Sequence, residues 1–403
     1  MCKNGLELRI VQLYYDSMIP RLLKTELLTQ LDEYPIVTLL GPRQAGKTTL
    51  VREVLTDYEY VSLETPDVRQ FALEDPRGFL AQYPPKVIFD EIQRVPELLS
   101  YLQGIVDQRQ VNGQFVLTGS HQLQLRAAVS QSLAGRTGVL HLLPFSIAEL
   151  DSVGIRFETF YDYIFHGFLP RIYDQKQRPN AAYANYYQTY VERDVRQLIQ
   201  LKDAGLFEKF IKLLAGRVGQ LINYQSLAND VGIDAKTIKQ WLSILEASFV
   251  VFKLPPYFEN FGKRVIKAPK YFFTDTGLLA YLLDIEKPSQ LLRDPLIGNM
   301  FENLVILEAF KARYNRGSKP NLYFYRDSHG KEIDLLYRSG SDLIGMEIKS
   351  ASTWNNDFKK TLKQFSTSNH PLAQSYVVYS GDRREFSDGV RALRYSDVGG
   401  LFQ

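Results

Sequence analysis

One segment of this chain has the residue types and the spacing that bind phosphate groups. Residues 41–49 read Gly-Pro-Arg-Gln-Ala-Gly-Lys-Thr-Thr and follow the apolar run 36–40, so the pattern G-x-x-x-x-G-K-[ST] stands where a strand should turn into a helix. Gly41 and Gly46 allow the backbone to curl until successive N–H groups point inward, where they and the next helix N-terminus attract phosphate. The segment predicts a site for a nucleoside triphosphate rather than an ordinary glycine turn.

The side chains that follow the second glycine have distinct expected roles. Lys47 should reach the β- and γ-phosphates of ATP. Thr48 should place its hydroxyl group on Mg²⁺, which prefers hard oxygen ligands, and Thr49 should begin the packing of the helix. The expected ATP-binding residues are Gly41, Pro42, Arg43, Gln44, Ala45, Gly46, Lys47, Thr48 and Thr49.

Two adjacent carboxylates end the buried-strand pattern Lys-Val-Ile-Phe-Asp-Glu at residues 86–91. This pattern is typical of a Walker B strand, in which Asp90 would hold Mg²⁺ through water. Glu91 would orient or deprotonate the attacking water, as a positioned carboxylate can. The alternative is a pair of surface acids at the end of a strand.

Two further positions could complete a site for ATP hydrolysis. The strand pattern of residues 114–118 stops in Thr118-Gly119-Ser120, where a sensor of the γ-phosphate would lie; Ser120 is the first choice and Thr118 the second. Arg136 could be an arginine finger acting across a subunit interface, because a guanidinium stabilises charge on a transferring phosphoryl group. It could equally be a solvated arginine.

Residues from about 206 to 274 have the order of elements of a winged helix. A helix that stops at Gly232 is followed by a second helix, capped by Asp234 and apolar on one face, and then by strand patterns at 249–254 and 270–274. If the second helix enters a DNA groove, its exposed N-terminal half and the wing would supply the contacts. The candidate DNA contacts are Lys236, Thr237, Lys239, Gln240, Lys263, Arg264 and Lys267. Winged helices also bind proteins, so a protein partner is the alternative.

The last third of the chain carries a second group of candidate metal ligands. The pattern predicts a helix at 298–314, strands at 322–326, 332–337 and 343–348, a helix at 356–365 and a strand at 376–379. Asp334 and Glu347 lie on adjacent strands and could share one Mg²⁺. Lys349 faces the same side of its strand as Glu347, where it could orient a water or stabilise charge on phosphorus.

This order of elements and carboxylates resembles the PD-(D/E)XK nuclease fold. Glu302, Asp334, Glu347 and Lys349 match its motif positions, and Gln364 could extend the motif on the following helix. The resemblance implies a Mg²⁺-dependent nuclease site. A catalytically idle copy that only binds its partner is the alternative.

Composition places the chain among ordinary globular proteins. Its 403 residues suffice for two or three domains, and 45% hydrophobic with 13% aromatic residues is compatible with real cores. The single cysteine, Cys2, excludes a disulfide framework and a cysteine-based zinc site, which suits a reducing cytosol. Residues 1–20 lack the apolar core of a secretory signal, and no run approaches a membrane span, so we expect a cytoplasmic protein without a membrane partner.

Alternation of short strands and helices from residue 21 onward predicts an α/β fold. Five strand patterns, at 36–40, 60–64, 87–90, 115–118 and 139–143, imply a five-stranded parallel sheet of an AAA-like P-loop domain. The expected organisation is an N-terminal extension (1–20), the ATPase core (21–144), a tyrosine-rich helical lid beside the ATP site (145–205), a winged helix (206–280) and a restriction-endonuclease-like α/β domain (281–403).

Seven short motifs together resemble one family, the prokaryotic ATPases with an AAA-like N-terminal domain and a C-terminal domain of the DUF4143 type. Besides the phosphate loop they are Phe-Asp-Glu-Ile-Gln at 89–93, Leu-Thr-Gly-Ser at 117–120, Leu-Ala-Gly-Arg at 133–136, Leu-Pro-Phe-Ser at 143–146, Thr-Asp-Thr-Gly-Leu at 274–278 and Phe-Glu-Asn-Leu-Val at 301–305. The resemblance spans nearly the whole chain. It implies ATP binding but supplies no substrate.

Three functions remain open at this point. The first is an oligomeric ATPase that acts on DNA through the winged helix and the nuclease-like domain. The second is an ATP-dependent switch, with slow turnover, whose C-terminal half recognises a protein partner. The third is an ATP-regulated, Mg²⁺-dependent nuclease. 

Overall fold

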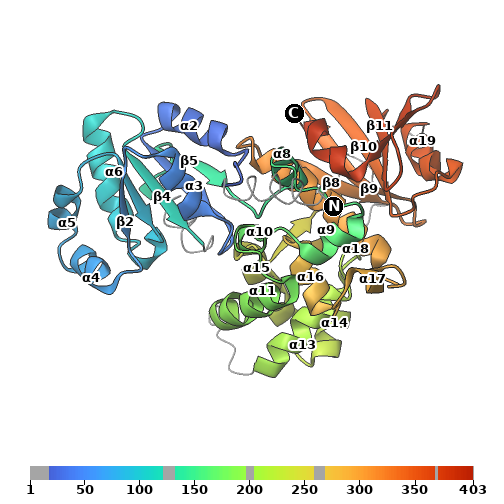
Figure 1. Cartoon of the computed structure of the whole chain (residues 1–403), viewed down its shortest axis with the longest axis horizontal. Coiled ribbons are helices and arrows are strands. Elements are labelled where there is room, and N and C mark those ends of the chain that lie inside the picture. The colour runs from blue at the N-terminus through green and yellow to red at the C-terminus, as the bar shows by residue number, and fades with distance from the viewer. Residues whose placement is uncertain (1–17, 121–131, 197–203, 258–267, 368–370, 403) are drawn as a thin grey trace, which may run out of the picture. The chain divides into compact units, whose positions relative to one another are not determined.

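The chain forms two units in a computed structural model that describes residues 18–120, 132–196, 204–257, 268–367 and 371–402 (Figure 1). The first unit comprises residues 1–145 together with the short stretches Ala247–Phe249 and Tyr314–Ser318. The second unit comprises the remainder, from Ser146 onward. The predicted end of the ATPase core, at residue 144, stays a prediction. The finer division into five domains stays a prediction as well.

A five-stranded parallel sheet forms the centre of the first unit, as the sequence predicts. Its strands are β1 (Ile36–Leu40), β2 (Glu59–Ser62), β3 (Val87–Asp90), β4 (Phe115–Gly119) and β5 (Thr137–His141). They lie in the order β2-β3-β4-β1-β5. Strand β4 thus lies between β1, which leads into the phosphate loop, and β3, which ends in Asp90. Two strands, β2 and β5, begin one or two residues earlier than the pattern predicts.

Apolar residues on both faces of this sheet are covered by helices. The helices of the unit are α2 (Lys24–Glu33), α3 (Lys47–Val54), α4 (Pro66–Glu74), α5 (Pro76–Gln82) and α6 (Leu98–Arg109), with a short 3₁₀ helix η1 (Ile92–Arg94). On one face, Leu27 of α2 and Val51 of α3 pack with Ile88 of β3 in a single buried cluster. On the other face, the ring of Phe79 from α5 lies 5.8 Å from that of Phe89. Neighbouring strand residues point to opposite faces, so Ile88 and Phe89 reach different cores.

The first part of the second unit is mainly helical. Its elements are α8 (Ile147–Ser152), α9 (Phe160–His166), α10 (Pro170–Asp174), α11 (Pro179–Tyr186), the π-helix η2 (Tyr187–Val195), α13 (Ala204–Ala215), α14 (Tyr224–Val231), α15 (Ala235–Ala247), β6 (Val251–Leu254), β7 (Lys270–Phe273), α16 (Thr276–Leu282) and α17 (Pro288–Leu291). Gly232 stops α14 with a φ of 97°, and Asp234 accepts the backbone N–H groups of Lys236 and Thr237 at 2.9 Å. Strands β6 and β7 pair in antiparallel fashion. The elements expected for a winged helix are present, and that assignment stays a prediction.

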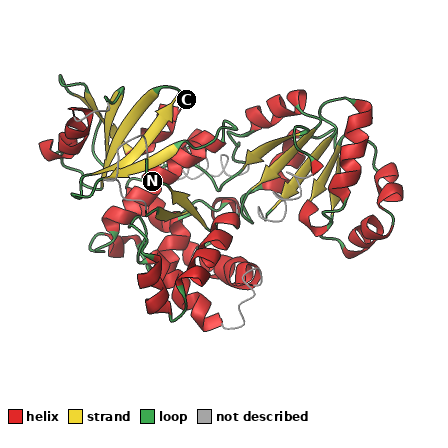
Figure 2. Cartoon of the chain, turned by 180° about the vertical axis from the view of Figure 1, so that it is seen from behind, coloured by secondary structure: helices red, strands yellow, loops and turns green. Residues whose placement is uncertain are grey.

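A six-stranded sheet follows, preceded by the 18-residue helix α18 (Ile297–Tyr314) and seen with its helices in Figure 2. The strands are β8 (Leu322–Arg326), β9 (Glu332–Ser339), β10 (Asp342–Lys349), β11 (Gln374–Tyr379), β12 (Arg384–Glu385) and β13 (Val390–Arg394), in the order β12-β13-β11-β10-β9-β8. Strands β8, β9 and β10 are antiparallel neighbours, and β10 pairs with β11 in parallel. Between them lie the 3₁₀ helix η4 (Asn356–Lys359) and α19 (Lys360–Thr367), and η5 (Tyr395–Phe402) comes last. Only β12, β13 and η5 were not predicted.

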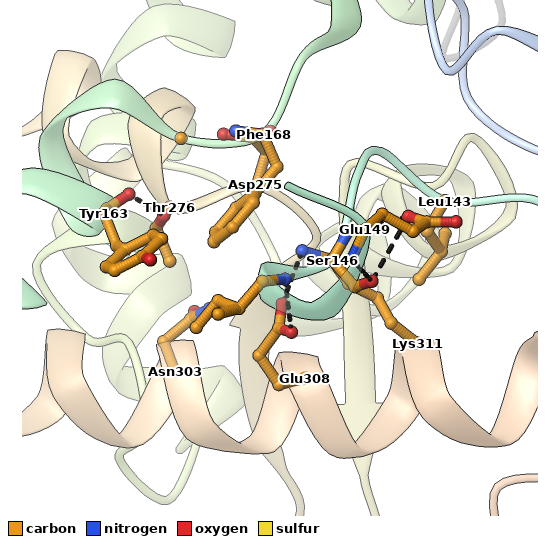
Figure 3. Close-up of polar contacts among 12 residues, drawn as sticks. Leu143, Ser146, Glu149, Tyr163, Phe168, Asp275, Thr276, Asn303, Glu308 and Lys311 are labelled. Carbon is orange, nitrogen blue, oxygen red and sulfur yellow. Dashed lines mark hydrogen bonds and ion pairs between the residues drawn. The ribbon is translucent and has the colours of Figure 1, made fainter. Parts of the chain in front are cut away.

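Buried polar contacts fix the helices of the second unit to one another (Figure 3). Asp275 accepts the N–H of Phe168 at 3.0 Å and the hydroxyl of Tyr183 at 2.6 Å. Glu308 of α18 accepts the N–H of Ile147 and the ammonium of Lys311, both at 2.8 Å. Burial raises the pKa of Asp275 and Glu308 and lowers that of Lys311. Among the described residues, none of the helices combines the length and apolar character needed to cross a bilayer.

Candidate functional site

The loop between β1 and α3 has the backbone conformation expected of a phosphate loop. Gly46 has a φ of 88°, in the left-handed region, and α3 starts directly after it at Lys47. A Cβ atom on Gly41 would lie only 2.0 Å from the carbonyl oxygen of Leu142. Both glycines are therefore required, one by its dihedral angle and one by close backbone approach. The loop leaves the N-terminus of α3 open to an anion.

Lys47 is buried and turned onto the loop that it follows. Its Nζ atom donates to the carbonyl oxygens of Gly41 at 2.9 Å and Pro42 at 2.8 Å. Burial lowers its pKa, although Glu91 and Asp90 favour the charged form. Neutral carbonyl groups are modest partners for an ammonium group, so phosphate oxygens can replace them. Thr49, in contrast, is exposed, and α3 begins its packing at Leu50, contrary to expectation, because the helical period turns position 49 outward.

Asp90 collects hydroxyl groups from three other elements. Its Oδ2 atom accepts from Thr48 at 3.0 Å and from Tyr60 at 2.6 Å, and its Oδ1 atom accepts from Thr118. Burial, with the hydrogen bond to Asp90, raises the pKa of Tyr60, which therefore stays a donor. Hydroxyl and carboxylate oxygens are hard ligands, so Thr48 and Asp90 fit Mg²⁺. Sequence reasoning missed Tyr60, which stands in β2 outside every motif.

Glu91 directly follows β3 and is held by two polar side chains. Its backbone has a φ of 57°, and its carboxylate accepts from Ser120 at 3.1 Å and from Gln93. Gln93 also reaches Ser120 at 3.3 Å. Because β4 is the neighbour of β3, Ser120, directly after β4, lies next to Glu91, directly after β3; its role as a γ-phosphate sensor stays a prediction. Gln93 was quoted in a motif but given no role.

Arg21 and Arg136 differ in what they hold: Arg21 contacts the phosphate loop, whereas Arg136 lies beside Ile36, at the start of β1. Arg21 donates to the carbonyl oxygens of Ala45 and Leu143, both at 2.6 Å, and so ties the phosphate loop to the segment after β5. Arg136 forms a bidentate pair with Asp107 of its own chain, at 2.5 and 2.9 Å. An arginine finger would have to give up this pair. The role of Arg136 stays a prediction.

The four residues of the nuclease-like motif lie in the second unit, and the structure brings three of them into direct contact. Lys349 donates to Glu347 at 2.7 Å and to Asp334 at 3.2 Å. Asp334 also accepts the N–H of Ile348 at 2.7 Å. Glu302 of α18 instead contacts Lys270, at 2.8 Å.

Two residues that the sequence did not suggest join this carboxylate–lysine cluster, which we define as Lys270, Glu302, Glu332, Asp334, Glu347 and Lys349. Lys270 of β7 lies 2.5 Å from Glu332 as well as 2.8 Å from Glu302. Burial raises the pKa of Glu302 and Glu347. Glu302, Glu332 and Asp334 each offer one oxygen, all within 4.8 Å of one another, so the described residues contain a possible metal-binding triad.

The candidate DNA contacts are only partly described. Lys236, Lys239 and Gln240 are exposed on α15, and the ammonium of Lys239 lies 5.1 Å from the ring centre of Tyr224. Thr237 is half-buried and bonds to Asp234. Gln364 is exposed on α19. Lys263, Arg264 and Lys267 fall outside the described residues.

Comparison with known families matches three successive parts of the chain. Residues 33–151 match an AAA domain, residues 157–289 a domain of unknown function (DUF8612) and residues 297–398 a domain of unknown function (DUF4143). An uncharacterized protein of Mycobacterium tuberculosis is 32% identical over 368 residues, which cover 89% of this chain and 80% of that protein. An uncharacterized protein of Haemophilus influenzae is 25% identical over 277 residues, 65% of this chain and 64% of its own length.

Solved structures show weaker similarity. The Walker-type ATPase of Pyrococcus abyssi is 16% identical, with 64% of this chain and 94% of that chain covered and a TM-score of 0.42. AMPPCP-bound DnaA from Aquifex aeolicus is 14% identical, with coverage of 56% and 85% and a TM-score of 0.28. Scores this low carry no conclusion about the present chain.

Proposed function

Because this chain belongs to the family of AAA-like P-loop ATPases with a C-terminal DUF4143 domain, we propose that it binds Mg·ATP at residues 41–49 and hydrolyses it with Glu91 as the base. The observation that carries the proposal is the position of Glu91, directly beyond Asp90 and in contact with Ser120 at 3.1 Å. A carboxylate at that place can accept the proton of an attacking water. The remaining members of the site support this role.

Each protein group has a separate task in the proposed reaction. Lys47 leaves the carbonyl groups of Gly41 and Pro42 and binds the phosphate oxygens, which carry more charge. Thr48 and Asp90 hold Mg²⁺, which when bound neutralises charge on the phosphates. Glu91 gives up its bonds to Ser120 and Gln93 to accept a proton from water, and Ser120 then bonds to the γ-phosphate.

We propose that this ATPase acts on DNA. Helix α15 carries exposed basic and polar side chains after its cap at Asp234: Lys236, Lys239 and Gln240. Their exposure favours contact with a polyanion. The same proposal includes a homo-oligomer in which Arg136 of one copy reaches the ATP of the next. If the chain does not bind DNA in this way, the alternatives are a protein partner or nuclease action of the second unit.

The test is ATP hydrolysis by the wild type and by Lys47→Ala, alone and with single-stranded, duplex or branched DNA, at low and moderate salt. Stimulation by one form of DNA that weakens with salt and is absent in the variant supports an ATPase directed to DNA. Hydrolysis that every DNA leaves unchanged supports the switch with a protein partner. Equal hydrolysis by the wild type and Lys47→Ala contradicts the proposed site.

A further inference from the structure

One residue distinguishes the carboxylate–lysine cluster from an open metal site, and that residue is Lys270. It is the first residue of β7, and it pairs with Leu254 of β6 and forms an isolated bridge with Leu221. Its backbone is therefore fixed from two sides. The side chain is only 3% exposed, and its ammonium group ends 2.5 Å from Glu332 and 2.8 Å from Glu302.

The carboxylates around this ammonium group have the arrangement of a cation site. Oxygens of Glu302, Glu332 and Asp334 all lie within 4.8 Å of one another. A divalent cation binds carboxylate oxygens at about 2.0–2.6 Å, so three oxygens this close can share one ion. The Nζ atom of Lys270 contacts two of the three, so it takes up the space in which such an ion would bind.

Charge supports the same reading. The ammonium group of Lys270 contacts two of the three carboxylates, at 2.5 and 2.8 Å. Partly buried carboxylates are stabilised by a cation, and here the protein supplies one covalently.

A second observation comes from Glu347, on the strand next to Asp334. Its side chain is 4% exposed, its Oε2 atom accepts from Lys349, and its Oε1 atom is buried without a hydrogen-bond donor. An ammonium group carries half the charge of Mg²⁺ and three directed N–H bonds. The two lysines of the cluster therefore leave one buried carboxylate oxygen, on Glu347, without a hydrogen-bond donor.

We propose that the ammonium group of Lys270 substitutes for a divalent cation among Glu302, Glu332 and Asp334, closes this site to Mg²⁺ in the wild type, and yields the site to divalent cations when a neutral side chain replaces it. The inference does not depend on ATP hydrolysis, because all of its residues lie in the second unit.

The experiment measures binding of Mn²⁺, as a spin probe for the Mg²⁺ site, to the full chain without nucleotide. We expect Lys270→Met to bind about one Mn²⁺ per chain more than the wild type, and Lys270→Met/Asp334→Asn to lose that ion. Mn²⁺ should also raise the Tm of Lys270→Met by several degrees and leave that of the wild type unchanged. Lys311→Met is the matched control: Lys311 is equally buried, at 1% exposure, but it contacts Glu308 rather than the triad of Glu302, Glu332 and Asp334, and its loss should create no Mn²⁺ site there.

Two results would overturn the proposal. One is a Mn²⁺ ion bound by the wild type and lost in Asp334→Asn, which would show that the site is open. The other is a folded Lys270→Met chain that binds no more Mn²⁺ than the wild type. If Lys270→Met does not fold, the first comparison still decides: equal Mn²⁺ binding by the wild type and Asp334→Asn supports a closed site, and a difference rejects it.

Discussion

Two buried lysines of this chain, Lys47 and Lys270, are held in opposite ways. Lys47 donates to two neutral carbonyl groups, whereas Lys270 lies between the carboxylates of Glu302 and Glu332. Both ammonium groups make charge-assisted hydrogen bonds, but the carboxylates add a Coulomb attraction to Lys270 that the neutral carbonyl groups do not give Lys47. The first lysine can therefore exchange its partners for phosphate. The second is held in place by two carboxylates, so the two proposed roles differ: a phosphate ligand for Lys47 and an internal counter-ion for Lys270.

Replacing each lysine by methionine should break this comparison most clearly. Lys270→Met leaves partly buried carboxylates without their cation and should lower the free energy of unfolding by about 3 kcal/mol. Lys47→Met removes two hydrogen bonds to neutral carbonyl groups but also removes a desolvated charge, which offsets part of the loss, so it should cost less, about 1–2 kcal/mol. Urea denaturation followed by circular dichroism measures both. Equal losses would mean that the two lysines are not held differently.

For ATP turnover we expect the reverse of the order found for stability, with the larger effect at Lys47. Lys47→Ala should reduce the turnover of ATP about 10²–10³-fold, because it removes a charged donor to the transferring phosphoryl group. Glu91→Gln should reduce turnover to a similar degree while ATP still binds, since only the base is lost. Phosphate release and binding of a fluorescent ATP analogue separate the two effects.

Glu64→Gln is the matched control for Glu91→Gln. Glu64 lies near the same site, but its pairs with Arg43 and Arg94 are 3.9 Å long and its side chain is half exposed. The turnover of Glu64→Gln should stay within about twofold of that of the wild type, because an exposed ion pair contributes little. Normal hydrolysis by Glu91→Gln would remove the assignment of the base.

The contrast between the two units also explains which parts of the structure could be predicted from the sequence. Most of the nucleotide site is made of short runs with fixed spacing, at 41–49, 89–93 and 117–120, so motif and strand order sufficed to place it. Tyr60 escaped because a tyrosine in a strand carries no motif. In the second unit, the helix 298–314 and four strands were predicted, but the partners of Lys270 are 32 residues and more away, and no local pattern shows such a pair.

The two unpredicted strands have a physical reason as well. Strand β12 consists of two exposed residues, Arg384 and Glu385, and offers no apolar alternation. Strand β13 alternates only briefly. In contrast, three family motifs acquire a reason that the sequence did not give: Ser146 caps α8, Asp275 caps α16, and the side chain of Asn303 bonds to both backbone groups of Phe273. Their role is to fix helices and strands of the second unit.

Tyr60→Phe should sharpen the account of the nucleotide site with a smaller effect. The variant removes the 2.6 Å hydrogen bond to Asp90 and leaves the ring in place. A hydrogen bond to a charged group contributes about 1.5–3 kcal/mol, so Asp90 becomes less well oriented for Mg²⁺. We expect the Mg²⁺ concentration for half-maximal turnover to rise about tenfold or more, with turnover at saturating Mg²⁺ changed little. Tyr58→Phe is the control, because Tyr58 bonds to the carbonyl of Gly113 instead. An unchanged Mg²⁺ requirement in Tyr60→Phe would separate Tyr60 from the metal site.

The smallest expected effect tests the proposed DNA contacts. A lysine that binds a DNA phosphate releases counter-ions, so Lys239→Gln should reduce the slope of log affinity against log salt by about 1 and weaken binding similarly for all sequences. Lys212→Gln is the control, since Lys212 is also partly exposed but is occupied by Glu208 and Asp284 at 3.4 and 3.7 Å. Fluorescence anisotropy of labelled duplex DNA at several salt concentrations measures both slopes. Equal slopes for the wild type and Lys239→Gln would show that DNA does not bind at Lys239. We would then expect α15 to bind a protein through the exposed face that Lys236 and Gln240 share, with an affinity that does not depend on salt.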